Sequence, residues 1–292
     1  MIGISDGNGH PFSFSAIVNG FDEQAFARAG WPVIHDYLRA RPQADFGLGP
    51  ARVTHAWTQE PEVTRRLCAA CGVATACGSP EEMAGAVDAV IVARDDWPSH
   101  RALAAPFLER GVPVLVDKPL SLAADDLAWF APHLHAGRLM SSSGLRYARE
   151  LDALRVPTGE WPIGMPQLVN ATVLNDLAHY GVHMLDALAG IGLAPGDSPV
   201  VRRLNLPHEA VSIQPAGGPP ILLHCLGAVG KTFHLEIFGR ESHAQFDLHD
   251  NFTAFRRLLA AFVRMVETGE PPIDPDETLA IMGVIAGAVE RP

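Results

Sequence analysis

The chain has little positive charge and no long apolar run. Its 292 residues include 22 Lys and Arg against 33 Asp and Glu, a formal net charge of -11. Nucleic acids and anionic membranes bind to basic surfaces, so this balance argues against both as partners. No stretch approaches the roughly 18 apolar residues that span a bilayer, and the first residues do not resemble a secretion signal. We therefore expect a cytoplasmic protein that binds a small molecule.

Cysteine is also scarce. The four cysteines, Cys68, Cys71, Cys77 and Cys225, do not have the regular spacing of a disulfide-rich domain. Cys68 and Cys71 are one helical turn apart, but a zinc site needs four convergent ligands and only Cys77 lies near them in the sequence. We expect free, buried thiols and no metal site built from them.

Short apolar runs alternate with helical patterns in the first half of the chain. The predicted strands cover residues 1–5, 51–57, 88–93, 112–117 and 138–144, and the predicted helices cover 60–72, 98–111 and 121–137. This alternation is typical of a Rossmann-type parallel sheet with helices on both faces. An extra helix is expected near residues 30–42, where it either covers the cofactor cleft or decorates the surface.

The second half of the chain has a different order of predicted strands and helices. We predict strands at 167–173, 219–229, 231–239 and 242–248, and helices at 176–189, 251–269 and 274–290. The neighbouring strands favour antiparallel pairing, whereas 145–155 and 206–220 are expected to be loops that determine substrate specificity. The predicted organisation is α/β: residues 1–145 form a dinucleotide-binding domain, and 146–292 form an α+β domain for substrate binding and oligomerisation with a mostly antiparallel sheet.

A glycine-rich turn follows the first predicted strand. Gly7 and Gly9, with Asn8 and His10 beside them, would let backbone amides approach a dinucleotide diphosphate at the start of the next helix. The pattern is incomplete, because Phe12 stands where G-x-G-x-x-G requires its third glycine. An ordinary tight turn is the alternative interpretation.

The second predicted strand ends without the acid that usually binds the adenosine ribose. Trp57 and Thr58 stand there instead, suited to stacking on adenine and to bonding a ribose hydroxyl. Without an acid or an arginine at this tip, the sequence leaves the choice between NAD and NADP open. Trp57 is equally suited to a place in the core.

Lys118 follows the fourth predicted strand, between Asp117 and Pro119. Open α/β sheets bind ligands at the carboxyl ends of their parallel strands. Lys118 is therefore expected to point into the ligand-binding cleft. Its ammonium could donate to a hydroxyl or carbonyl oxygen and stabilise negative charge that develops there. The alternative is a solvated lysine at a strand end.

The predicted helix 176–189 carries an unusual set of ionisable groups. Asp176, His179, His183 and Asp186 are spaced by three, four and three residues, so they share one helix face. His183 is the candidate acid/base group, because the ordinary pKa of imidazole is near neutral. A metal site using His179 and His183 and a purely structural polar helix are the alternatives, although no glutamate follows His179 as H-E-x-x-H requires.

Three segments together resemble the Gfo/Idh/MocA family of NAD(P)-dependent oxidoreductases, which act mostly on sugars, cyclitols and their derivatives. Residues 88–122 look like the family's strand, histidine-led helix and E-K-P signature, with Asp117-Lys118-Pro119 as the variant here. Residues 179–190, HYGVHMLDALAG, resemble its D-x-G-x-H-x-x-D segment, and 251–272 resemble its C-terminal helix. The resemblance implies NAD or NADP as cofactor, a sugar-like or cyclitol-like substrate, and a homo-oligomer, either a dimer or a tetramer.

The resemblance also implies site residues. Lys118 and His183 would lie beside the nicotinamide and the substrate, and His179 stands in place of the motif's aspartate. The residues expected near the cofactor are Arg94, His100 and Asp117, and Asp176 and His179 are expected near the substrate, with His179 also a catalytic candidate. In the predicted loop 145–155, Arg146 and Tyr147 are candidates for substrate contact, with surface roles as the equal alternative. The altered glycine pattern and Arg94-Asp95, where the family has Thr-Pro, keep a second hypothesis open: a binding protein or pseudoenzyme with the same fold.

Overall fold

A computed structural model describes residues 1–155, 160–196 and 199–290 and confirms the α/β fold class. Its internal contacts divide the chain into two compact units. The first unit comprises Met1–Leu120, Ala128–Ser141 and Phe255–Pro272; the second comprises Ser121–Leu127, Ser142–Ala254 and Ile273–Pro292. The domain boundary between residues 145 and 146 stays a prediction, and the division adds that a late segment of the chain belongs with the first unit.

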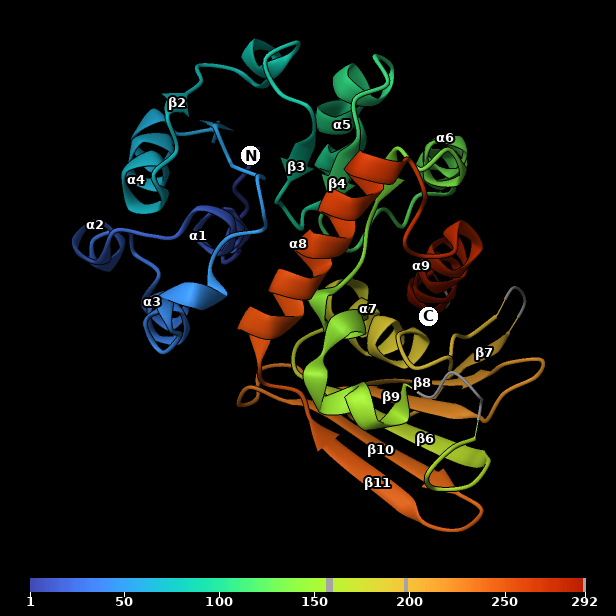
Figure 1. The fold of residues 1–292 in the computed structure, drawn as a ribbon. Coiled ribbons are helices and arrows are strands. Elements are labelled where there is room, and N and C mark those ends of the chain that lie inside the picture. Colours follow the sequence, from blue (N-terminus) through green and yellow to red (C-terminus); the bar gives the residue numbers. More distant parts are fainter. Residues whose placement is uncertain (156–159, 197–198, 291–292) are drawn as a thin grey trace. The chain divides into compact units, whose positions relative to one another are not determined.

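The first unit contains a parallel sheet (Figure 1). Its strands are β1 (His55–Ala56), β2 (Thr75–Ala76), β3 (Val90–Val92), β4 (Val114–Val116) and β5 (Leu139–Met140). Ile2 forms parallel bridges to both Trp57 and Val92, so Met1–Gly3 takes the central place between β1 and β3. The resulting order, β2-β1-Met1–Gly3-β3-β4-β5, is that of a dinucleotide-binding sheet. The first predicted strand is therefore in the expected place but shorter than expected, and β2 was not predicted.

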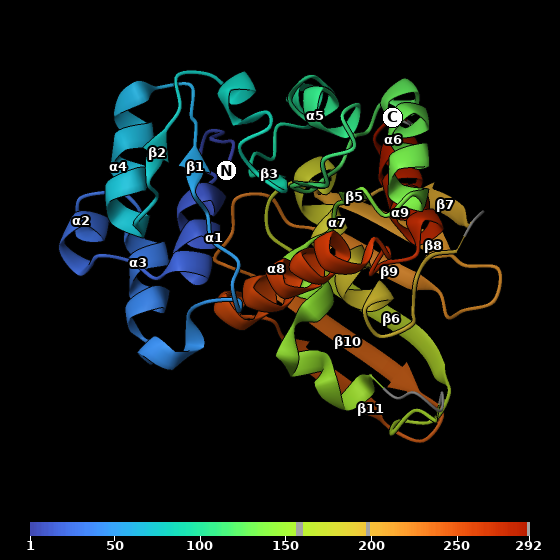
Figure 2. The ribbon, with the colours of Figure 1, turned by 45° about the horizontal axis from the view of Figure 1, so that its top comes forward.

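The connection between Met1–Gly3 and β1 holds the inserted helices. Helices α1 (His10–Asn19), α2 (Glu23–Ala27) and α3 (Pro32–Arg39) precede β1, and α4 (Pro61–Cys71) follows it. Helix α2 contacts α3 and α4, and α3 also contacts α1 (Figure 2). Aromatic contacts help to hold this layer together, because Phe26 packs edge-on against Phe12 and Phe21.

Three later helices contribute to the first unit. They are α5 (His100–Leu108), the second half of α6 (Ala124–His135) and residues 255–268 of α8 (Asn251–Thr268). Phe255 meets the rings of His10 and Phe14 edge-on, and Arg256 donates through Nε to the Asp45 carbonyl oxygen at 2.7 Å. Residues more than 200 positions apart are thereby joined in one core.

The second unit contains a six-stranded sheet in the order β11-β10-β6-β9-β8-β7. These strands are β6 (Pro166–Val173), β7 (Val200–Arg203), β8 (Glu209–Gln214), β9 (Ile221–Cys225), β10 (Phe233–Gly239) and β11 (His243–Asp247). All neighbours are antiparallel except β6 and β9. The prediction of a loop throughout 206–220 was wrong, because β8 lies inside it. The other predicted loop, 145–155, forms two short 3-10 helices, Gly144–Tyr147 and Arg149–Leu154.

Helices α7 (Leu177–Ala189) and α9 (Pro275–Val289) accompany this sheet. Helix α7 contacts β6 and β9, and α9 contacts α7 and β7. In β9, Ile221, Leu223 and Cys225 are buried while the residues between them are half-buried, the period of two expected for a strand with one covered face. An aspartate caps each helix, and Asp176 accepts a hydrogen bond from the His179 amide at 2.9 Å. The predicted helix 176–189 is confirmed.

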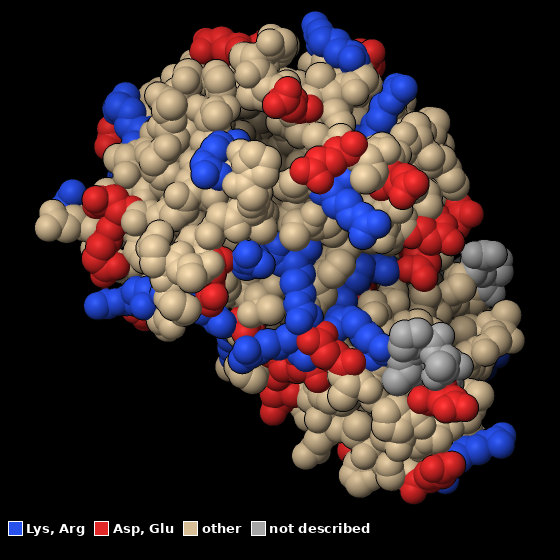
Figure 3. All heavy atoms as spheres, viewed as in Figure 1, with Lys and Arg blue, Asp and Glu red and all other residues tan. Residues whose placement is uncertain are grey.

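Acidic and basic side chains are interspersed over the face of the molecule in Figure 3, and the basic groups in the middle of that view have acidic groups beside them. The four cysteines are free, and all but the half-buried Cys68 are buried. None of the helices in the described residues has the length and apolar character needed to cross a membrane.

Candidate active site

The order of strands in the first unit reverses between Met1–Gly3 and β3, and polar residues follow both. The Ser5 hydroxyl donates to Asp95 Oδ1 at 2.5 Å, and the Asp95 amide donates back to the Ser5 hydroxyl at 3.1 Å. The carboxyl ends of strands at such a reversal form the usual ligand site of open α/β sheets. Ser5 and Asp95 thus lie at the predicted edge, although the sequence analysis did not name Ser5 and noted Asp95 only as a departure from the family pattern.

Lys118 lies at the end of β4 and is buried, with 4% of its surface exposed. Its Nζ is 3.7 Å from Asp95 Oδ2. A buried ammonium requires such a partner, because removing its charge from water is costly. The alternative of a solvated lysine is therefore wrong, and Lys118 stays the candidate for polarising a ligand oxygen.

Asp117 holds the turn before Lys118 in place. Its Oδ2 accepts from Asn8 Nδ2 at 3.0 Å and lies 2.5 Å from His10 Nδ1, while its Oδ1 accepts the Lys118 amide at 2.8 Å. Burial alone would raise the pKa of Asp117, but the His10 ring, then Lys118 and Asn8, hold that pKa well below its ordinary value. Three predicted cofactor residues, Asn8, His10 and Asp117, are brought together as a network within the protein.

The two glycines of the turn differ. Gly7 is exposed, has φ of +70°, and an added Cβ would meet nothing within 4 Å. Gly9 is buried, and an added Cβ would lie 2.4 Å from Ile34 Cδ1 and 2.7 Å from Trp31 Cε3. Gly7 fits the predicted open turn, whereas Gly9 is needed because the inserted helix α3 and the residue before it lie against it.

The residues predicted to bind adenosine are partly engaged in the fold. Trp57 is half-buried and donates through Nε1 to the Gly78 carbonyl oxygen at 3.2 Å. The buried Thr58 hydroxyl donates to the Glu60 carbonyl oxygen at 2.8 Å and lies 2.8 Å from the Thr64 hydroxyl. Thr58 therefore shapes the start of α4, and its hydroxyl is used there.

Arg94 and His100 connect the loops that follow β3 and β4. The Arg94 guanidinium forms an ion pair with Asp96. The fully buried His100 ring lies 2.9 Å from the Leu120 carbonyl oxygen through Nδ1 and 2.8 Å from the Arg94 carbonyl oxygen through Nε2. His100 thus ties together the two loops that flank Lys118, and it supports the site from inside the protein.

The second unit holds His183 on α7. The imidazole is 9% exposed, its Nδ1 lies 2.6 Å from the Ser143 hydroxyl, and its ring contacts Tyr180 and Phe233. The Ser143 amide in turn donates to Asp186 Oδ2 at 2.7 Å. These contacts fix both the position and the orientation of the imidazole.

Charged groups lie behind Ser143. Arg146, predicted to contact substrate, donates through Nε to Asp186 Oδ1 at 3.0 Å and through Nη1 to Glu277 Oε2 at 2.8 Å. Burial alone would lower the pKa of Arg146, but the Asp186 and Glu277 carboxylates outweigh burial and raise it. Burial raises the pKa of the neighbouring Tyr147 to about 12. In this structure, Arg146 is engaged in an ion-pair network that supports α7.

Asp176 and His179 form a separate pair at the start of α7. Asp176 Oδ1 lies 2.9 Å from His179 Nδ1, and both side chains are about half exposed, at 50% and 45%. Asp176 and His179 thus pair with each other, whereas His183 contacts Ser143 and Asp186 pairs with Arg146. No cluster of three or more His, Cys, Asp or Glu suited to a metal ion occurs in the described parts of the chain, so the metal hypothesis gains no support.

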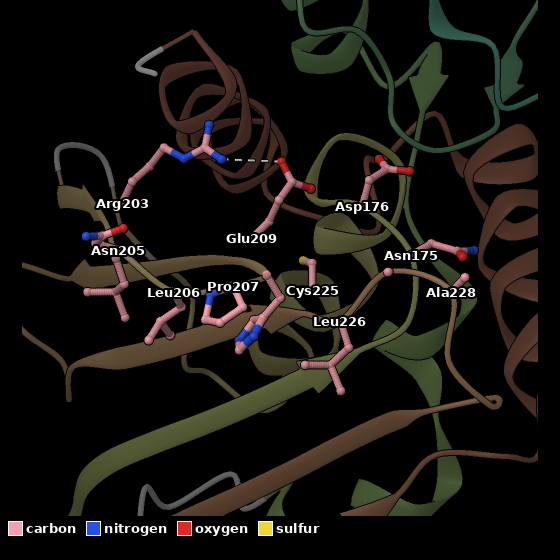
Figure 4. Close-up of a pocket in the computed structure, with 13 residues that line it drawn as sticks. Asn175, Asp176, Arg203, Asn205, Leu206, Pro207, Glu209, Cys225, Leu226 and Ala228 are labelled. Atoms are coloured by element: carbon pink, nitrogen blue, oxygen red, sulfur yellow. Dashed lines mark hydrogen bonds and ion pairs between the residues drawn. The ribbon is translucent and has the colours of Figure 1, made fainter.

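A cavity of about 980 Å³ lies at the same end of α7 (Figure 4). Asp176 and Glu209 line it, Glu209 accepts the Leu177 amide at 2.9 Å, and Arg203 lies 3.5 Å from Glu209. The other polar residues that line it include Asn175, Asn205 and His208. Carboxylate, amide and guanidinium groups together suit a ligand with several hydroxyls.

Comparison with known proteins confirms the expected resemblance. Residues 27–131 match the model of the Gfo/Idh/MocA family, described as an oxidoreductase family with an NAD-binding Rossmann fold. At the level of the family, this match confirms the expected oxidoreductase class and the nicotinamide type of cofactor. The matched segment contains Lys118 and begins after the glycine turn. A search of curated proteins found no match.

Solved structures share the fold. Myo-inositol 2-dehydrogenase from Lactobacillus plantarum has a TM-score of 0.73 at 14% identity, over 99% of this chain and 95% of that one. Myo-inositol dehydrogenase from Corynebacterium glutamicum has a TM-score of 0.69 at 16% identity, over 83% of this chain and 89% of that one. GenD2 from gentamicin A biosynthesis, in complex with NAD, has a TM-score of 0.70 at 18% identity, over 87% of this chain and 88% of that one.

The residues at the sheet edge fit one end of a nicotinamide dinucleotide. An ammonium, a carboxylate and a hydroxyl, from Lys118, Asp95 and Ser5, are suitable partners for ribose hydroxyls and a carboxamide. The first turn of α1 does not fit the diphosphate in the same way, since its amides are bonded within the chain. The residues at the sheet edge thus suit the nicotinamide end of the cofactor, whereas the first turn of α1 does not present free amides to its diphosphate.

Proposed function

We propose that the protein is an oxidoreductase that uses NAD or NADP and acts on a hydroxyl or carbonyl group of a sugar-like or cyclitol-like molecule. The observation that carries this proposal is the buried Lys118 ammonium, held 3.7 Å from Asp95 at the carboxyl edge of a parallel sheet. The family match over residues 27–131 supports it. The inositol dehydrogenases among the similar structures support the substrate class.

Lys118 and His183 have different chemical roles in this proposal. A bound nicotinamide cofactor would supply the hydride chemistry. Lys118 donates a hydrogen bond to the substrate oxygen and stabilises the negative charge that develops on it. His183 takes the hydroxyl proton during oxidation and returns it during reduction, with its ring oriented by the Ser143 hydroxyl at Nδ1.

The cavity beside Asp176 is the proposed site for the hydroxylated body of the substrate. Its polar residues come from the segment just before α7, from the end of β7, from the loop between β7 and β8, and from the start of β8. Arg203→Ala and Asn205→Ala are expected to raise KM several-fold with little change in kcat, because they remove contacts equally important in the ground and transition states. A fall in kcat with an unchanged KM would contradict this assignment.

The direct test uses purified protein, NAD and NADP, and a panel of inositols, aldoses and nucleotide sugars. Nicotinamide absorbance follows oxidation, and the reverse direction is tested with NADH or NADPH and the corresponding ketones. Turnover with one substrate, lost in Lys118→Ala, is the expected result. If no member of the panel is turned over and neither reduced cofactor binds, the oxidoreductase proposal is wrong.

A binding protein without turnover is the second candidate. It is favoured by the first turn of α1, where the amides that would hold a diphosphate are engaged within the chain. Calorimetry with the same sugars separates the two candidates. Sugar binding that neither requires nor responds to NADH, together with an absence of turnover, would favour the binding protein.

A homo-oligomer and a cytoplasmic location belong to the same proposal. The face of the six-stranded sheet that carries Leu222 and His224 is less buried than the face with Leu223 and is the proposed contact between copies. Size-exclusion chromatography with light scattering should give a dimer or a tetramer. Leu222→Arg should shift it toward the monomer, and a wild-type monomer at micromolar concentration would refute the proposal.

A further inference from the structure

We infer that Ile34 and Trp31 close the glycine turn against the diphosphate of a dinucleotide and thereby determine the affinity for the cofactor. This inference rests on the proposed function, since it concerns how that cofactor binds. It assigns a role to the inserted helices, for which the sequence left two interpretations open. The residues concerned all belong to the first unit.

The contacts at Gly9 show the closure directly. In a dinucleotide-binding turn, a glycine at this place leaves room for the diphosphate to approach the backbone. Here the space beside the Gly9 Cα is filled from within, because an ideal Cβ would lie 2.4 Å from Ile34 Cδ1 and 2.7 Å from Trp31 Cε3. The absent side chain makes room for α3 and Trp31.

The amides of the first turn of α1 are also engaged. The His10 amide donates to Asn8 Oδ1 at 2.8 Å, and Pro11 has no N–H to offer. The Phe12 and Ser13 amides both donate to the Gly9 carbonyl oxygen at 3.1 Å. The Ser13 bond is the first bond of any α-helix, so a diphosphate would have to replace the bonds of the His10 and Phe12 amides, whereas a G-x-G-x-x-G turn presents its amides ready for the ligand.

The charges near the glycine turn also oppose the binding of a diphosphate there. The Asp117 carboxylate, whose pKa is held low, lies within hydrogen-bond distance of both Asn8 and His10. A diphosphate placed at the start of α1 would meet this fixed negative charge. The positive Lys118 is paired with Asp95, so part of its attraction for an anion is already used.

A closed turn lowers the apparent affinity of a ligand that needs it open, in proportion to the fraction of molecules that are open. Substitutions that loosen the closure should therefore tighten cofactor binding. Ile34→Val removes Cδ1, the atom nearest to the position of a Gly9 Cβ, and Ile34→Ala removes more of the same contact. Val33, the residue before Ile34 in α3, is 73% exposed, so Val33→Ala is the matched control.

The experiment is a titration of each variant with NADH, followed by nicotinamide fluorescence, with thermal unfolding as the check on folding. We expect the dissociation constant to fall in the order wild type, Ile34→Val, Ile34→Ala, by about tenfold across the series, and to stay unchanged in Val33→Ala. Reduced nicotinamide riboside, which has no phosphate, is titrated in parallel. Its affinity should be the same in all four proteins.

Other results would overturn the inference in distinguishable ways. If wild type and both Ile34 variants bind NADH with equal affinity, or the variants bind it more weakly, the turn is not closed against the diphosphate, while the proposed function stands. If the variants tighten binding of the riboside as much as that of NADH, the substitutions act elsewhere than at the diphosphate. If none of the four proteins binds NADH, the inference and the cofactor assignment both fail.

Discussion

Lys118 and His183 are held by different kinds of contact, and the difference matches what each group is proposed to do. Lys118 has a carboxylate directly beside it, Asp95, and its own amide is bonded to another, Asp117. His183 Nδ1 has the neutral Ser143 hydroxyl as its partner, and Asp186 lies behind that serine. A carboxylate is the partner that a buried ammonium needs, which suits a fixed cation. A hydroxyl can accept from or donate to imidazole, so it orients a group whose proton must come and go.

Removing the charge behind Ser143 should have the largest effect. Asp186→Ala removes one of the two carboxylates that pair with the buried Arg146 and leaves Glu277. Breaking a buried pair in this way costs about 3–5 kcal/mol of the free energy of unfolding. Urea unfolding measures it, and Asp152→Ala, at the exposed ion pair with Arg155, is the control expected to cost under about 1 kcal/mol. A small loss in Asp186→Ala would show that the network does not support α7.

The next effect is on turnover. Lys118→Ala and His183→Ala should each lower kcat by about two orders of magnitude or more, as the loss of an acid/base group commonly does. The double variant should lose much less than the product of the two factors if both groups act on one transition state. Steady-state kinetics and circular dichroism spectra of the three variants provide the test. Multiplicative losses would mean that the two residues contribute independently of each other.

Acid should reveal the role of Asp117. Because its pKa is lowered in the folded state, its ionised form stabilises the fold above the unfolded pKa of about 3.9, and this contribution is lost as the pH falls further. The wild type should therefore be more stable than Asp117→Asn at pH 7, and the difference should shrink below about pH 4. Urea unfolding at pH 7, 5, 4 and 3 measures it. A difference independent of pH would show that the carboxylate charge does not matter.

The smallest effect should come from the serine beside His183. Ser143→Ala removes the hydroxyl that orients Nδ1, and we expect kcat to fall by about fivefold, the equivalent of one hydrogen bond of about 1 kcal/mol. Ser143→Thr keeps a hydroxyl and should restore most of the activity. The pH dependence of kcat should change in Ser143→Ala, because the hydroxyl contacts the group that titrates. Equal kcat and pH profiles in all three proteins would remove Ser143 from the mechanism.

The elements were predictable where their periodicity is strong. Helices α4, α7, α8 and α9 lie within a few residues of their predicted bounds, since each has a continuous apolar face or a clear end signal such as Gly72 after α4. Strand β8 was missed because its run, Glu209–Gln214, lies between proline and glycine residues that favour a loop. The parallel pairing of β6 with β9 follows from the order of the strands in the sheet, which short-range sequence patterns do not encode.

The candidate site was predictable only in part. Lys118, Asp117 and His183 stand in recognisable local patterns at a strand end and on a helix. Asp95 was read only as a departure from the family pattern, because its partner Ser5 is 90 residues away and their contact follows from the order of the strands. Ser143 ends a run of three serines after β5, a signal that could have drawn attention to it. The closure of Gly9 depends on side chains from the inserted helices, and no glycine pattern reveals them.

The position of residues 255–268 in the first unit limits the order in which the two units can fold during synthesis. Phe255 and Arg256 contribute to the core of the first unit, against His10 and the Asp45 carbonyl oxygen. A ribosome must therefore translate most of the second unit before the first can bury its last helix. Until then, the surface that receives this helix stays open, and a nascent chain that stalled near residue 250 would expose it to chaperones.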